Sequence, residues 1–165
     1  MSNEYSLDAE EIPRAEGDGF EKVVDAESAV EALWDNAVAV VKQAGKHKPV
    51  LFVFEAERVM MVAVSDFFET AEGRVNFMQF VHEIASTRPD SQGVVLAMEA
   101  QYLEIGMVGQ DTTGGTRSLV VMAEWRNRTD FARKAEIIED GDELIVGLSE
   151  VVPERGLHEF GGVYK

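Results

Sequence analysis

The sequence contains no cysteine among its 165 residues. This absence excludes disulfide bonds, thiol catalysis and thiolate metal sites, and it fits the reducing cytoplasm, where we expect the protein. Cationic side chains are also scarce: 15 Lys and Arg stand against 31 Asp and Glu, which gives a net charge of −16. Because proteins bind nucleic-acid backbones through Lys and Arg, direct nucleic-acid backbone binding is not expected.

Long apolar runs are missing too. The longest run covers residues 59–64, whereas a membrane-spanning helix needs roughly 20 apolar residues. The N-terminal residues show neither the basic nor the apolar segment of a signal peptide. We therefore expect one soluble domain with its own core and no membrane contact.

Acidic residues are concentrated near the N-terminus. In the first 35 residues, eleven carboxylates stand against only Arg14 and Lys22. The first 24 residues show no sustained periodicity and are interrupted by a proline and two glycines. We therefore predict an acidic arm over residues 1–24, a single α+β domain over 25–152 and a glycine-rich tail over 153–165. Such an arm would attract basic partners.

Two helices are predicted from the spacing of apolar residues. Residues 26–44 repeat apolar side chains at i, i+3 and i+4, with Asp25 as the N-cap and Gly45 just after the last turn. A second apolar stripe runs through residues 70–87, and Pro89 requires that helix to end before it.

Six strands are predicted, and the final two are joined by an Asp-Gly hairpin turn. The order α-β-β-α-β-β-β-β favours a two-layer α/β sandwich, with a mainly antiparallel sheet of about six strands and two helices on one face. The predicted strands cover residues 50–55, 58–64, 94–104, 117–126, 133–139 and 143–150.

A candidate site depends on how the C-terminal strands pair. If strands 94–104 and 117–126 fold symmetrically about their glycine-rich connection, Glu99 lies opposite Glu124. The last hairpin then adds Glu136 to the same face. Like charges this close destabilise a sheet unless a cation, a raised pKa or nearby arginines offset them. The three residues are therefore a candidate carboxylate cluster for metal binding or catalysis, and the simpler alternative is a solvated polar face.

The same face is predicted to carry apolar side chains among the carboxylates. A mixed face of this kind is typical of a surface covered by a second copy, by a partner protein or by the N-terminal arm. The predicted interaction residues are Leu103, Val120, Met122, Ile138 and Ile145.

Motifs of known enzyme and cofactor sites are missing. The chain has no G-x-S-x-G nucleophile turn, and His82 has Ser86 where a zinc-binding helix would have its second histidine. No cofactor is therefore expected. The one basic cluster, Lys46-His47-Lys48, is a candidate phosphate contact, although the preference of helix C-termini for cations explains it more simply.

Two segments resemble small uncharacterised proteins of bacteria, phages and plasmids. The segments are VVLAMEAQYLEIGM and RKAEIIEDGDELIVG, in which Glu99 and Glu136 match acidic positions of those proteins. Gln101 stands where the resemblance leads us to expect Trp. The resemblance implies an α+β fold of unknown function, carried by a mobile element.

Three functions remain open on the sequence. The favoured one is a non-enzymatic protein-interaction or assembly module, with a protein partner or a second copy of the chain. The second is an acidic DNA mimic that inhibits a DNA-binding protein, a hypothesis supported by the net charge of −16. The third is a metal-dependent enzyme that uses Glu99, Glu124 and Glu136.

Overall fold

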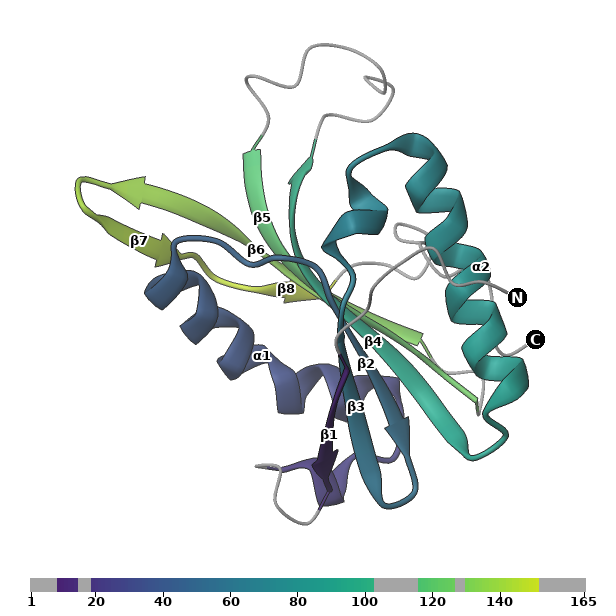
Figure 1. Cartoon of the computed structure of the whole chain (residues 1–165). Coiled ribbons are helices and arrows are strands. Elements are labelled where there is room, and N and C mark those ends of the chain that lie inside the picture. Colours follow the sequence, from purple (N-terminus) through teal and green to yellow (C-terminus); the bar gives the residue numbers. More distant parts are fainter. Residues whose placement is uncertain (1–8, 15–18, 103–115, 127–129, 152–165) are drawn as a thin grey trace.

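The structure, a computed structural model, describes residues 9–14, 19–102, 116–126 and 130–151. These residues confirm an α+β fold, in which two α-helices pack on one antiparallel sheet of eight described strands (Figure 1). The α-helices are α1 (Ala26–Ala44) and α2 (Ala71–Thr87), and two short 3-10 helices are η1 (Phe20–Lys22) and η2 (Ser65–Phe68). The strands are β1 (Ala9–Pro13), β2 (Val50–Glu55), β3 (Arg58–Ala63), β4 (Ser91–Tyr102), β5 (Thr116–Trp125), β6 (Asp130–Asp140), β7 (Glu143–Val146) and β8 (Glu150–Val151).

The ends of α1 match the sequence prediction. Asp25 caps the helix by accepting a hydrogen bond from the Ser28 backbone N–H at 2.9 Å, and the Ser28 hydroxyl accepts one from the Asp25 N–H. At the other end Gly45 adopts a left-handed conformation with a φ of 82°, which costs little for glycine because it has no Cβ.

No helix in the described ranges is both long and apolar enough to cross a membrane.

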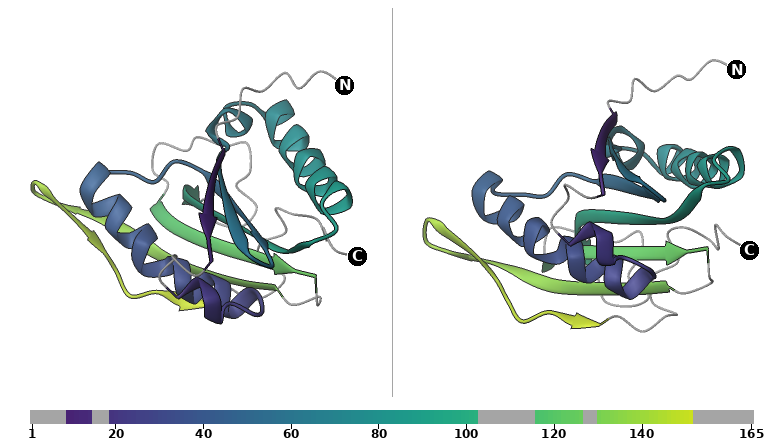
Figure 2. Two further views of the ribbon diagram at one scale, coloured as in Figure 1. Left: turned by 60° about the horizontal axis from the view of Figure 1, so that its bottom comes forward. Right: turned by 90° about the horizontal axis from the view of Figure 1, so that it is seen from below.

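The strands follow the order β1-β3-β2-β4-β5-β6-β7, and β8 pairs with β6. Every described pair is antiparallel. The sheet curls into a half-barrel, and α1 lies along its concave side (Figure 2). The sheet is larger than predicted, because the N-terminal segment adds β1 and the last predicted strand is divided into β7 and β8.

The two helices pack on opposite faces of the sheet, so the predicted two-layer arrangement with both helices on one face is wrong. Val95 and Ala97 of β4 belong to the core under α1, whereas their neighbours Val94 and Leu96 belong to the core under α2. Successive side chains of a strand point to opposite faces. The unbroken apolar run of β4 therefore reflects a strand that is covered on both sides.

Much of the predicted acidic arm belongs to the domain. Strand β1 pairs with β3, and Phe20 and Val23 are buried in the core under α1. The acids of β1 are exposed, and Glu11 forms an ion pair with Arg58 at 3.0 Å. The described part of the predicted arm therefore belongs to the sheet and its core, while the predicted tail at 153–165 lies outside the described residues.

Arg14 holds this N-terminal segment in place. Its guanidinium donates hydrogen bonds to the backbone carbonyls of Phe20, Val23 and Glu55, and to the Gln92 side chain at 2.7 Å. The residue is only 9% exposed, and burial lowers the pKa of the guanidinium. Because no described carboxylate pairs with it, the charge is stabilised by carbonyl and amide dipoles.

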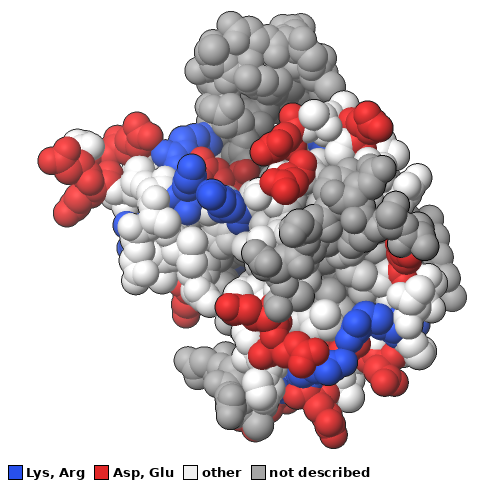
Figure 3. All heavy atoms as spheres, in the orientation of Figure 1, with Lys and Arg blue, Asp and Glu red and all other residues white. Residues whose placement is uncertain are grey.

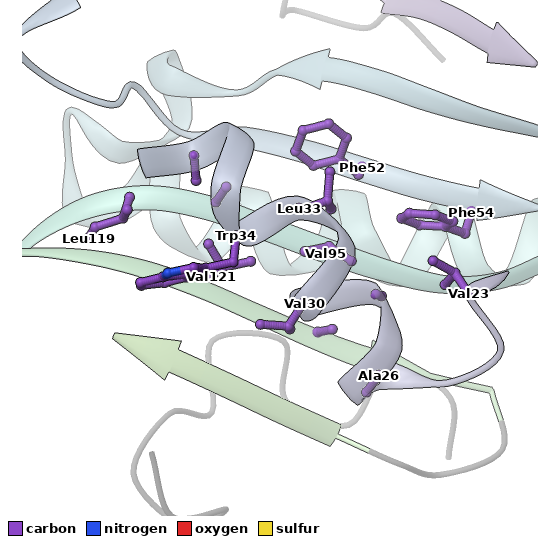
Figure 4. Close-up of a cluster of buried hydrophobic side chains, with 14 of the residues drawn as sticks. Val23, Ala26, Val30, Leu33, Trp34, Phe52, Phe54, Val95, Leu119 and Val121 are labelled. Atoms are coloured by element: carbon purple, nitrogen blue, oxygen red, sulfur yellow. The ribbon is translucent and has the colours of Figure 1, made fainter. Parts of the chain in front are cut away.

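Aromatic rings contribute to the core that packs against α1, Phe54 among them (Figure 4), and the Arg14 guanidinium lies 5.8 Å from the centre of the Phe54 ring. The Phe54 ring lies 5.5 Å from that of Phe20 and 5.3 Å from that of Trp125, between ring centres. Gly93 faces Trp125 in the next strand, and a Cβ there would lie 2.0 Å from the Trp125 ring. This end of the core therefore has no room for a larger side chain at Gly93.

Candidate functional site

The three predicted carboxylates do not come together. The observed register pairs Glu99 with Leu119, whereas Glu124 pairs with Val94. Glu99 therefore shares the face of α1, and Glu124 shares the opposite face. Glu136 is on the same face as Glu124 but six positions along β5 from it, opposite Ser118. No group of three potential metal-ligating side chains is found within the described ranges.

The predicted interaction face is divided between the core and the surface. Val120 is fully buried and Met122 is 5% exposed, and both belong to the core that also contains the buried side chains of α2. Ile138 and Ile145 lie directly opposite each other and are 41% and 40% exposed. Leu103 lies outside the described residues. Among the described residues of this face, the exposed ones therefore lie in the β6–β7 hairpin.

A cavity of about 240 Å³ lies between the C-terminal half of α1 and the sheet. Its walls are apolar and come from α1 and from strands β2, β3 and β4. They include Leu33, Ala37, Val40, Phe52, Met61 and Ala97. Because Ala37 and Ala97 are small, helix and strand leave a space that larger side chains would have filled.

The rim of this cavity is basic. Lys46, His47 and Lys48 follow the end of α1 and line the cavity with their side chains or backbone. The His47 ring is held by a hydrogen bond of 2.8 Å between Nδ1 and the Lys48 carbonyl. Since a carbonyl only accepts, Nδ1 carries the proton and donates. Burial lowers the pKa of His47, against the opposing effects of this hydrogen bond and of Glu99, so the ring is neutral at pH 7.

Arg117 joins the rim to the β6–β7 hairpin. Its guanidinium binds Glu99 through Nε, Glu139 of the hairpin at 2.8 Å and the Gly45 carbonyl at 2.9 Å. Glu99 in turn accepts a hydrogen bond of 3.4 Å from the His47 backbone N–H. Glu99, a member of the predicted carboxylate cluster, thus pairs with an arginine and helps to position the rim.

The outer face of the β6–β7 hairpin combines apolar and acidic residues. Register places Glu136, Ile138, Asp140, Glu143 and Ile145 on one side, which we call the acidic hairpin face. Residues 135–151 contain six acids and no base. Figure 3 shows Asp and Glu gathered at the hairpin tip and Lys and Arg gathered beside it. The hairpin therefore presents negative charge next to a positive region.

Comparison of this chain with protein-family models, curated proteins and solved structures finds no match. Its function must therefore be inferred from its own residues.

Sequence reasoning noticed part of this arrangement and missed the rest. The basic Lys46-His47-Lys48 cluster stood out in the sequence, but nothing there showed that it borders an apolar cavity. The small residues Ala37 and Ala97 were visible in the sequence. They indicate a cavity only when it is known that α1 packs across β4. The buried role of Arg14 had no sequence signal beyond its isolation among acids.

Proposed function

We propose that this chain is a non-enzymatic protein-interaction module, and that it binds a basic, extended protein segment at the acidic hairpin face. One observation carries the proposal: among the described residues, four of the six exposed large apolar side chains lie in residues 138–151, within the acidic stretch. Exposed apolar residues rimmed by charge are typical of protein-binding surfaces.

The edge of the sheet supports the same conclusion. Strand β7 ends the strand order, and no described strand pairs with its outer side. The opposite edge, β1, carries Pro13 and the outward carboxylates Glu10 and Glu11, which discourage the addition of another strand. Because β7 has neither proline nor lysine, a partner strand can add to its backbone while its basic side chains meet the hairpin acids.

Charge argues for a basic partner over a second copy of this chain. Two acidic hairpin faces brought together would repel each other. The acidic residues flanking Ile138 and Ile145 would instead attract lysine and arginine of a partner and speed its association. We place this interaction in the cytoplasm of a cell that carries the gene on a phage or other mobile element, as the sequence resemblance suggests.

Capture from a cell lysate tests the proposal. The chain is immobilised in wild-type form, as an Ile138→Ser/Ile145→Ser variant, and as a Val75→Ser control that removes an exposed apolar residue of α2. We expect a basic protein that wild type and control retain, that the hairpin variant loses, and that high salt releases. Equal capture by all three chains would contradict the proposal, as would a stable wild-type dimer in light scattering.

The acidic DNA mimic is a second candidate, which the net charge of −16 favours. In that function the captured partner would be a DNA-binding protein, and added duplex DNA would displace it from this chain. Retention of the partner in excess DNA would argue against the mimic. The metal-dependent enzyme is not proposed further, because Glu99 and Glu124 occupy opposite faces of the sheet.

A further inference from the structure

The cavity under α1 departs from the packing of the rest of the core. Protein interiors are close-packed, and voids larger than a water molecule are few. At 240 Å³ this cavity is larger than the engineered apolar cavity of about 150 Å³ that binds benzene in another protein. Apart from Asn36 and the rim residues the lining is apolar, so it offers ordered water few partners. The space is therefore suited to an apolar group about the size of a substituted ring or a medium-length alkyl chain.

The rim adds a charge preference. Lys46 and Lys48 are both exposed, and neither takes part in an ion pair within the described part of the chain. The nearby acid Glu99 is already bound by Arg117. In a chain with a net charge of −16, two uncommitted cations thus lie at the mouth of an apolar cavity. An anionic group at this rim lies near two lysine residues of the lining, whose charge favours it over a neutral group.

We propose that this cavity binds a medium-chain carboxylic acid, whose apolar body fills the space under α1. The apolar body enters between Leu33, Phe52 and Met61, and the carboxylate stays at the rim with Lys46 and Lys48. The walls favour the body by removing apolar surface from water, and the lysines select an acid over a neutral molecule of the same shape. This site is separate from the acidic hairpin face.

Calorimetry with octanoate and octan-1-ol tests both parts of the proposal on the full chain. The two probes share an eight-carbon chain and differ in the charge of the head group. We expect octanoate to bind the wild-type protein about tenfold more tightly than octan-1-ol, the ratio that corresponds to about 1.4 kcal/mol. No octanoate binding at millimolar concentration would overturn the proposal, and equal affinity for the two probes would overturn its charged part.

Variants test separately what the cavity walls and the rim lysines contribute to binding. Ala37→Met fills the cavity, and Val40→Phe does so from a half-buried position if the first variant folds poorly. Either filled variant should lose binding of both probes by at least about tenfold. Lys46→Gln/Lys48→Gln should weaken octanoate alone, while the control Lys42→Gln, an exposed lysine of α1 that does not line the cavity, should leave both affinities unchanged. Undiminished octanoate binding in a folded, filled variant would place the ligand elsewhere and overturn the proposal.

Discussion

The two ends of α1 pack in different ways against the same sheet. At the N-terminal end, Ala26, Ala29 and Val30 are fully buried against a core that includes Phe54 and Trp125. At the C-terminal end, Ala37 and Ala44 face a cavity of about 240 Å³. Both ends present small residues of the helix, so the contrast comes from what lies opposite them.

The difference shows how a single helix can serve both stability and binding. Where the helix faces the core with Phe54 and Trp125, its small residues are densely packed. Where the facing strand residue is also small, as at Ala97, the same helix leaves room for another molecule. We therefore expect changes at the N-terminal end to affect folding and changes at the C-terminal end to affect binding.

The largest effect is expected from Arg14→Met. The variant removes the side-chain donor to the carbonyls of Val23 and Glu55 and to the Gln92 amide, and leaves the Phe20 carbonyl with only the Val23 N–H. The loss of one partner in a buried charged network costs about 3–5 kcal/mol. Urea denaturation measures this free energy of unfolding. Arg74→Met, at an exposed position of α2, is the matched control and should change stability by less than about 0.5 kcal/mol. Similar losses in the two variants would show that Arg14 has no special structural role.

The same substitution at the two ends of α1 should have opposite effects. Ala29 is fully buried, so Ala29→Met overpacks the core and should cost about 1–3 kcal/mol. Ala37 faces the cavity, so Ala37→Met should raise stability by about 0.5–1 kcal/mol. Paired urea denaturation curves give both values. If both variants lose stability equally, the two ends do not differ in packing.

Glu55 should make the free energy of unfolding sensitive to acid. The hydrogen bond from Arg88 holds the pKa of Glu55 below its ordinary value of 4.5, with further help from Arg58 and against the opposing effect of burial. Its stabilising contribution is therefore complete above pH 4.5 and is lost as the pH falls through the lower pKa of the folded state. Glu55→Gln should cost about 1.5 kcal/mol at pH 7 and should flatten the fall in stability below pH 4.5.

Stability measured from pH 7 downward checks this sign. In the Glu55→Gln variant the gap from the wild-type protein should narrow with acid. If the difference in the free energy of unfolding between the two proteins stays constant down to the lowest pH, Arg88 and Arg58 do not stabilise the Glu55 carboxylate in the folded state.

The smallest effect is expected at the start of α1. Asp25→Ala removes the oxygen that accepts from the Ser28 N–H and should cost about 1 kcal/mol. Thermal unfolding measures the loss, and the affinity of the cavity for octanoate should not change, because Asp25 lies at the opposite end of the helix. A weakened affinity would show that the two ends of α1 are coupled.

The local features of this fold could be predicted from sequence. Apolar spacing, an N-cap at Asp25 and a glycine at position 45 set both ends of α1, because these signals act within one turn of the chain. The β2 bounds and the last hairpin were predicted for the same reason, although the hairpin loop is Gly141-Asp142, one residue later than expected.

The longer-range features could not be predicted. A register shift by an odd number of residues moves side chains to the other face, and such a shift separated Glu99 from Glu124. The predicted pairing assumed a symmetric loop, whereas the actual register aligns Gly93 with Trp125. A strand that is covered on both faces has an unbroken apolar run and no alternation of polar and apolar residues. Its sequence therefore does not show which face each helix covers.

The hydrogen bonds of Arg14 also determine when the N-terminus can fold. Its partner Gln92 lies 78 residues later in the chain, and Glu55 lies 41 residues later. Contacts between distant residues close large loops and form late. During synthesis, the complete Arg14 site cannot exist until the ribosome has released residue 92. Strand β1 is therefore among the last elements to be held in place, and a chain that stops before β4 lacks the Gln92 partner of Arg14.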